Sequence, residues 1–137
     1  DYLFQVGYGY LTADVLSFAG LEAPDEVASF ETATARLRQA EELFEQSLSR
    51  DPANGYTWLA YAEALLAQGH EDSGTTALRR SFDLGPTTWR LAYGRLSLIA
   101  TLREATGDDA ALEEIYAVDR ITLHTFRPRL LEFLEES

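Results

Sequence analysis

The stretch from Pro52 to Pro86 decides the fold of this chain, and it reads PANGYTWLAYAEALLAQGHEDSGTTALRRSFDLGP. Its two prolines are 34 residues apart, a spacing in the range that is typical of helical repeats. Apolar or small side chains recur with the spacing i, i+4, i+7, i+8 at Trp58, Ala62, Leu65 and Leu66. This spacing predicts one face of an amphipathic helix in the first half of the stretch.

Local signals predict a turn and two helix starts inside the same stretch. Asn54 is placed to cap the first helix, and Asp72 is placed to cap a second one. Gly69 suits the turn between them, because glycine readily follows the end of a helix. Small residues at Ala62 and Gly74 allow two antiparallel helices to approach closely. The stretch is therefore predicted to be a helical hairpin.

These positions carry a family resemblance. The pattern resembles the tetratricopeptide repeat (TPR), which reads Trp-x2-Leu-Gly-x2-Tyr, then Ala-x3-Phe and finally Pro. The matching or similar residues here are Trp58, Gly74, Leu78 and Pro86. The resemblance is clearest over residues 40–86 and less complete over 1–19 and 87–124.

The resemblance implies an all-α fold: a TPR-like array of about three antiparallel helical hairpins (an α-solenoid) with a C-terminal capping helix. We expect residues 1–137 to form a single domain of this kind. Tyr10 and Ala40 are 30 residues apart, whereas the small position follows the Tyr position by about nine residues in a regular repeat. The first hairpin is therefore predicted to have lengthened helices at about 2–19 and 25–50. Alternating apolar residues leave a strand open as the alternative for the first of these.

Later helices are predicted from apolar stripes and from helix breakers. One helix is expected over about 89–106, and the next is expected to begin at Asp108 or Asp109. Pro128 interrupts that direction, because proline disfavours the helical conformation of the residue before it. Residues 129–136 are then predicted to form the capping helix. Its apolar side chains are Leu130, Leu131, Phe133 and Leu134.

Composition excludes several classes of function. The chain has 23 acidic and 11 basic residues and a formal net charge of −12, which repels duplex DNA and anionic lipid. Nucleic acid and membrane surfaces are therefore not expected as partners, and no apolar run approaches the ~18 residues of a membrane span. Cysteine and lysine are both absent. Their absence excludes disulfides, thiolate nucleophiles and Schiff-base chemistry.

No sequence motif for catalysis or metal binding stands out. The two histidines, His70 and His124, share no metal-ligand spacing, and the glycine motifs that bind phosphates or dinucleotides are missing. Adjacent acids occur at Glu41-Glu42, Asp108-Asp109, Glu113-Glu114 and Glu135-Glu136. Neighbours on a helix do not face each other, so none of these pairs forms a site by itself. We therefore expect no catalytic residue, no cofactor and no metal, and a carboxylate-dependent enzyme is the distant alternative.

The resemblance also implies candidate binding residues, because the first helix of each TPR repeat lines a concave groove that binds a peptide or protein. In the central repeat the lining positions are Tyr56, Leu59, Glu63 and Leu66. The same count gives Phe4, Tyr8 and Leu11 in the first repeat, and Arg90, Tyr93, Ser97 and Ala100 in the third. Tyrosine and arginine are common interface anchors. The predicted partner-binding residues are Tyr8, Tyr56, Leu59, Glu63, Arg90 and Tyr93.

Two alternatives stay open for these residues. Leu59, like the other apolar residues of the set, is equally suited to the core beneath neighbouring helices. In the third repeat, Tyr93-Gly94 also fits the Leu-Gly pair of the family pattern, two residues earlier than the strict count. That shift rotates the helix by about 200° and turns Arg90 and Tyr93 away from the groove.

We therefore predict a non-catalytic scaffold that binds a partner protein or peptide, or that organises a bacterial-style complex. The acidity favours a basic or apolar partner segment. The alternative is an obligate structural subunit of a larger assembly, membrane-associated or not. The dicarboxylate-clamp variety of the family uses lysine and asparagine to hold a peptide C-terminus, and it is not expected here because lysine is absent.

The start of the chain bears on its location. It begins at Asp1 rather than at a methionine, which predicts a preceding segment such as a signal peptide, an anchor or a tag. This slightly favours an extracytoplasmic, periplasmic location over a cytoplasmic one. The sequence does not indicate the oligomeric state.

Overall fold

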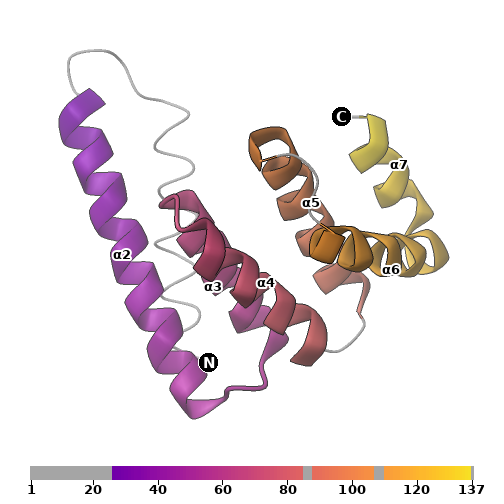
Figure 1. The fold of residues 1–137 in the computed structure, drawn as a ribbon, viewed down its shortest axis with the longest axis horizontal. Helices are drawn as coiled ribbons and strands as arrows, with labels where there is room; N and C mark the ends of the chain where they lie inside the picture. The colour runs from indigo at the N-terminus through magenta and orange to yellow at the C-terminus, as the bar shows by residue number, and fades with distance from the viewer. Residues whose placement is uncertain (1–25, 85–87, 107–109, 137) are drawn as a thin grey trace.

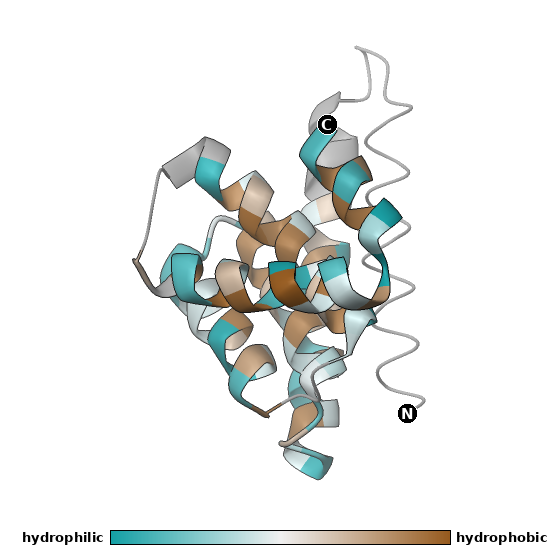
Figure 2. Ribbon diagram, turned by 90° about the vertical axis from the view of Figure 1, so that its right-hand side faces the viewer, coloured by the Kyte–Doolittle hydropathy of each residue, from teal (hydrophilic) through white to brown (hydrophobic). Residues whose placement is uncertain are grey.

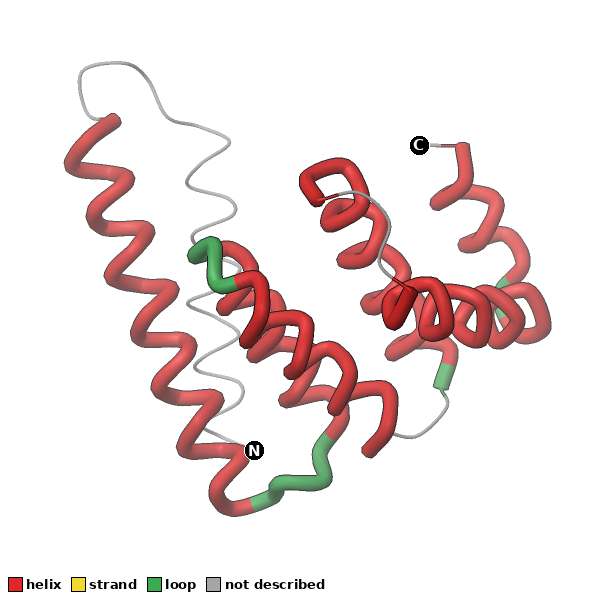
Figure 3. Tube along the Cα trace, viewed as in Figure 1, coloured by secondary structure: helices red, strands yellow, loops and turns green. Residues whose placement is uncertain are grey.

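The computed structural model describes residues 26–84, 88–106 and 110–136, which form helices joined by short loops and contain no strand (Figure 3). The predicted start at Asp108 or Asp109 lies outside these ranges. Within them are the helices α2 (Glu26–Arg50), α3 (Gly55–Ala67), α4 (Glu71–Leu84), α5 (Trp89–Thr106), α6 (Ala110–Phe126) and α7 (Pro128–Glu136), shown in Figure 1. The predicted all-α class is confirmed.

α2 confirms the long helix predicted over 25–50. Its buried side chains recur every three or four residues and include Ala33, Leu37, Ala40, Phe44, Ser47 and Leu48. Phe44 is fully buried and packs in one cluster with Ala60 and Ala64 of α3. The helix predicted over 2–19, together with its strand alternative, lies outside the described residues.

α3 and α4 form the predicted antiparallel hairpin, lying side by side next to α2 (Figure 1). Asn54 caps α3, because its Oδ1 accepts hydrogen bonds from the backbone amides of Tyr56 (3.1 Å) and Thr57 (3.3 Å). At the turn, Gly69 has a φ of 83°, a left-handed conformation that glycine adopts without steric cost. Its amide donates to the carbonyl of Leu66 at 3.0 Å. The predicted cap and the predicted turn are both confirmed.

The start of α4 differs from the prediction. The helix begins at Glu71, and its first backbone bond runs from the Gly74 amide to the His70 carbonyl (2.9 Å). His70 therefore occupies the cap position, and the prediction of Asp72 as the cap is wrong because Asp72 lies inside the first turn. A Cβ atom on Gly74 would lie 2.4 Å from Cγ of Leu66. The predicted need for a small residue at position 74 is confirmed.

α5, α6 and α7 complete the described part of the chain. α5 packs against α6, and α7 packs on both of them. Leu131 of α7 is buried in a cluster with Leu96 of α5 and Leu123 of α6, so the predicted capping helix is confirmed. It begins at Pro128, one residue earlier than predicted, and proline is well tolerated at a first helical position. Phe133, predicted as part of its apolar face, is exposed.

The main hydrophobic core lies where α3, α4, α5 and α6 meet. Its buried members include Leu65, Leu78, Leu91, Ile99 and Ile115. Figure 2 shows hydrophobic residues gathered where helices face one another and hydrophilic residues mostly on the outside. No helix in the described part of the chain is long and apolar enough to cross a membrane.

Two opposite charges are buried inside this core. Arg95 of α5 is 2% exposed and Asp119 of α6 is 0% exposed. The guanidinium donates to the carboxylate in a two-pronged arrangement, Nε to Oδ2 at 2.7 Å and Nη2 to Oδ1 at 2.9 Å. Its Nη1 donates to the carbonyl of Ser81 at 2.9 Å, near the end of α4. One side chain thus joins three helices.

The hydroxyl group of Thr57 is buried without a hydrogen-bond partner among the described residues. The side chain of Thr57 is 0% exposed. We expect Thr57→Val to raise the free energy of unfolding by about 1 kcal/mol, because an unsatisfied buried hydroxyl costs its desolvation energy. Urea unfolding followed by far-UV circular dichroism measures this. In the matched variant Thr76→Val, at an exposed position, we expect a change within about 0.5 kcal/mol. A loss of stability in Thr57→Val would contradict the prediction.

Candidate partner-binding site

A cavity of about 600 Å³ lies between α3 and α5. Its lining residues are Tyr56, Leu59, Ala60 and Glu63 from α3, and Arg90, Tyr93, Gly94, Ser97, Leu98 and Thr101 from α5. The volume falls in the range of roughly 300–1,000 Å³ that is typical of ligand pockets. Two further cavities in the described ranges are smaller, at about 390 and 470 Å³, and neither is lined by a predicted binding residue.

Two contacts hold α3 and α5 together along the cavity. The hydroxyl groups of Tyr56 and Thr88 are hydrogen-bonded at 2.9 Å, and Thr88 Oγ1 also accepts from the Leu91 amide at the start of α5. One turn further along α3, Leu59 lies directly against the backbone of Gly94, where a Cβ atom would come within 2.6 Å of its Cδ2. The two helices therefore run in the same direction, and Gly94 permits their close approach.

The structure brings together five of the six residues predicted to bind a partner. Tyr56, Leu59, Glu63, Arg90 and Tyr93 all line the α3–α5 cavity. Tyr8 lies outside the described residues. Tyr56 is 39% exposed, so part of its ring is accessible to another molecule. Leu59 is buried but still contributes to the lining, so it serves both the core and the cavity wall.

The position of the third-repeat residues agrees with the strict 34-residue count. Arg90 and Tyr93 line the same cavity as Tyr56, whereas the shifted register would have turned them away. Two other residues from the count do not line the cavity. Leu66 packs against Gly74 of α4, and Ala100 is exposed outside the lining.

Charge is unevenly distributed along the cavity. Arg90 lies near the start of α5, at the end where Tyr56 meets Thr88. Glu63 lies seven residues after Tyr56, which is about 10 Å along the axis of α3. The cavity thus carries a positive charge towards one end and a carboxylate towards the other, with apolar and aromatic side chains between them.

Glu63 is in an unfavourable environment for a charged group. Its side chain is half-buried, and within the described residues its carboxylate makes no hydrogen bond and no ion pair. Burial raises the pKa of Glu63 from 4.5 to about 7, because removing a carboxylate from water disfavours its charged form. At neutral pH the group is therefore close to half-ionised.

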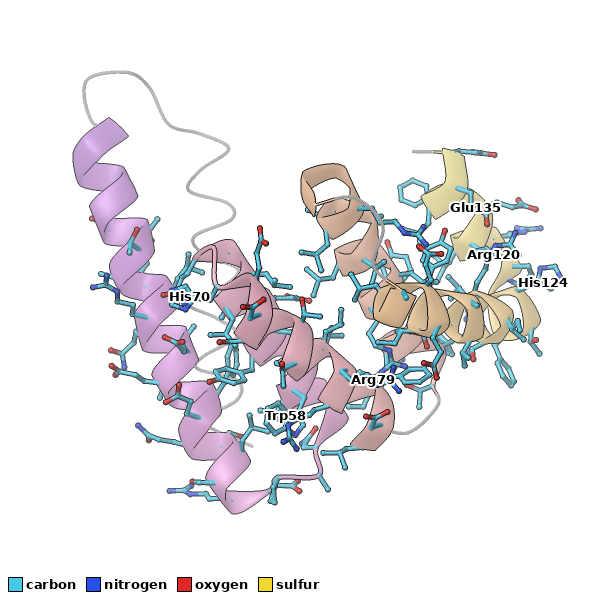
Figure 4. The ribbon with its side chains drawn as sticks, in the orientation of Figure 1. Trp58, His70, Arg79, Arg120, His124 and Glu135 are labelled. Atoms are coloured by element: carbon cyan, nitrogen blue, oxygen red, sulfur yellow. The ribbon has the colours of Figure 1, made fainter. Side chains whose placement is uncertain are left out.

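The two histidines lie far apart, and the adjacent acids are spread over several elements of the described chain. Glu41 and Glu42 line the cavity of about 390 Å³ together with His70, whereas Asp108-Asp109 lies outside the described residues. His70 lies at the α3–α4 turn beside α2, whereas His124 lies near the end of α6, at the opposite side of the molecule (Figure 4). Glu113 pairs with Arg103, and Glu114 pairs with Arg79 at 3.1 Å. In the part of the chain that the structure describes, no group of three or more histidine or acidic residues is arranged to hold a metal ion.

Sequence reasoning missed Ala60, Gly94, Leu98 and Thr101 of the cavity lining. Thr101 follows Ser97 by four residues, which is closer to one helical turn of 3.6 residues than the step of three that leads to Ala100. The choice between these steps depends on how α5 is rotated against α3. Leu59 of α3 lies against Gly94 of α5. A glycine inside a predicted helix was the available sequence signal for this close approach.

Comparison with known protein families identifies the central part of the chain. The model of the family described as "Tetratricopeptide repeat" matches residues 32–87. Residues 32–87 are therefore similar to a TPR repeat, which supports the resemblance. The match covers most of α2 and all of α3 and α4, so the predicted repeat at 40–86 is confirmed. The comparison with curated proteins and the comparison with solved structures found no match.

The TPR assignment gives a general function. TPR repeats mediate protein–protein interaction, and the family is typically non-catalytic. The helical structure is consistent with a TPR-like solenoid. Of the helices that line the cavity, α3 lies inside the matched segment and α5 follows it.

Proposed function

We propose that this chain is a non-catalytic interaction scaffold, and that the α3–α5 cavity binds a segment of a partner protein. The observation that carries the proposal is the convergence of Tyr56, Tyr93 and Arg90 on one cavity of about 600 Å³. Tyrosine and arginine dominate binding energy at interfaces because they combine large contact area with directed hydrogen bonds. The net charge of −12 favours a basic or apolar segment over an acidic one.

Tyr56 is the residue to test first. We expect Tyr56→Ala to raise the dissociation rate of a bound peptide by about tenfold or more, because truncating an aromatic anchor acts mainly on dissociation. The probe is the tightest binder selected with the wild-type chain from a phage library of random short peptides, and surface plasmon resonance measures its dissociation rate.

A matched variant separates the ring from the hydroxyl. Tyr56→Phe loses the 2.9 Å bond to Thr88 but keeps the aromatic face, so we expect it to release the peptide at nearly the wild-type rate. If Tyr56→Ala stays folded and leaves dissociation unchanged, the cavity is not the binding site.

An obligate structural subunit is the second candidate, and exposed apolar residues favour it. Ile121 and Phe126 of α6 are 67% and 58% exposed, and Phe133 of α7 is 61% exposed. Burial of apolar side chains of this size by a neighbouring subunit stabilises the assembly. Light scattering of the isolated chain tests this candidate. A stable monomer at high concentration favours the reversible scaffold, and concentration-dependent association favours the subunit.

A further inference from the structure

Glu63 stands out as a charge without a partner. Its carboxylate faces a cavity whose lining includes Leu59, Ala60, Gly94 and Leu98. Proteins rarely keep a carboxylate in such surroundings unless a cation or hydrogen-bond donors compensate its lost hydration. Among the described residues, none supplies that compensation.

The other charged and titratable groups of the cavity do not neutralise Glu63. Among the described residues of the lining, they are Tyr56 on its own helix, and Arg90 and Tyr93 on α5. Arg90 lies near the far end, and its guanidinium lies over the Trp89 ring at 5.2 Å. The lining contains no residue of α2 or α4. The described lining therefore places no positive charge against Glu63.

We propose that the α3–α5 cavity selects a partner segment that places one lysine or arginine side chain against Glu63, beside an apolar side chain. This inference rests on the proposed function and adds to it the kind of partner segment that the cavity binds. A basic side chain suits the site because its hydrocarbon stem packs on apolar walls while its charged end reaches the carboxylate. The chain's net charge of −12 attracts such a segment from a distance.

Arg90 limits what the cavity accepts. A second basic residue of the ligand near Arg90 would meet a like charge, which disfavours binding. We therefore expect one basic residue at a fixed position, and not a run of basic residues. This distinguishes recognition at Glu63 from a general attraction between an acidic protein and a basic peptide, which would improve with every added charge.

The raised pKa of Glu63 makes this recognition sensitive to pH. The group is mostly neutral below its pKa of about 7 and mostly charged above it. A ligand that binds only the charged form then loses about tenfold in affinity between about pH 8 and about pH 6.

Selection from a phage library of random short peptides tests the inference, with wild type and Glu63→Gln screened side by side at about pH 8. We expect wild type to enrich sequences with one lysine or arginine at a fixed position next to an apolar residue. Glu63→Gln keeps the size of the side chain and removes its charge, so we expect that position to lose its basic preference. Glu132→Gln, which removes an exposed charge on α7, should select the same sequences as wild type.

The outcomes separate the two proposals. If wild type enriches no sequence, the proposed binding function fails and this inference falls with it. A second outcome is that wild type enriches peptides without a basic residue at a fixed position, or that Glu63→Gln enriches the same basic residue as wild type. In either case the cavity binds peptides, but Glu63 does not determine which peptides bind. For the best wild-type peptide, fluorescence anisotropy should show the tenfold loss of affinity at about pH 6 in wild type only. An equal loss in Glu63→Gln would overturn the inference.

Discussion

Asp119→Ala is expected to lower the free energy of unfolding by about 3–5 kcal/mol, because it leaves the Arg95 guanidinium buried without a counter-charge. Arg95 is 2% exposed, so its guanidinium stays away from bulk solvent when the carboxylate is removed. Its remaining bond, to the carbonyl of Ser81 at 2.9 Å, does not balance a full charge. Urea unfolding with linear extrapolation measures the loss.

Two further variants make this result interpretable. The double variant Arg95→Met, Asp119→Leu removes both charges and is expected to recover most of the lost stability, since a buried ion pair is often replaceable by apolar residues. Glu135→Ala breaks the exposed pair that Glu135 forms with Arg120 at 2.7 Å (Figure 4), and we expect it to cost no more than about 1 kcal/mol. A loss in Asp119→Ala as small as that in Glu135→Ala would contradict the prediction. If Asp119→Ala does not fold while the double variant does, the unpaired guanidinium is responsible.

The central hairpin could be predicted from the sequence because its signals are local and agree. Asn54, Gly69 and Gly74 each act within a few residues, through a cap, a left-handed turn and a close approach. Asp72 was misassigned for the same reason. Aspartate is a good cap wherever it stands near a helix start, and a shift of two residues in that start, from Asp72 to His70, places it inside the helix.

The buried pair was missed because it depends on two helices that meet in space. The sequence does carry a signal, since Arg95 falls in the apolar stripe Leu91, Ile99 and Leu102, and Asp119 falls in the stripe Leu112, Ile115 and Leu123. Opposite charges, each inside an apolar stripe of a neighbouring helix, indicate a buried ion pair. Taken by itself, either stripe indicates only an apolar helix face that is interrupted by one charged residue.

The candidate site was largely predictable through the repeat, because the 34-residue spacing places equivalent residues of α3 and α5 on the same side. That spacing brought Arg90 and Tyr93 into the lining with Tyr56 and Glu63. It gives no information about burial, so the environment of Glu63 could not be read from the sequence. Glutamate on a helix surface is ordinarily hydrated, and the burial that removes part of this hydration from Glu63 arises only in the folded chain.

Glu63 is expected to make the folded chain less stable as the pH rises from about 5 to about 8, by up to about 3 kcal/mol. Its pKa is about 7 in the folded chain and ordinarily 4.5, so the folded state holds this proton more tightly than the unfolded state. The stabilisation from the bound proton is present in full below about pH 4.5 and is lost as the pH rises towards 7. Unfolding in urea across this pH range measures the effect.

Glu63→Gln isolates this contribution from the other titrating groups. We expect the two chains to be about equally stable near pH 4.5, and Glu63→Gln to be more stable by about 2–3 kcal/mol near pH 8, since glutamine carries no charge to desolvate. Glu132→Gln is the control for loss of one exposed acidic charge, and its difference from wild type should stay within about 0.5 kcal/mol at both pH values. Parallel curves for wild type and Glu63→Gln would show that the carboxylate is hydrated in the folded chain. A confirmed difference would show that the folded chain leaves the charged form of Glu63 uncompensated, which is the condition that the proposed recognition of a basic side chain requires.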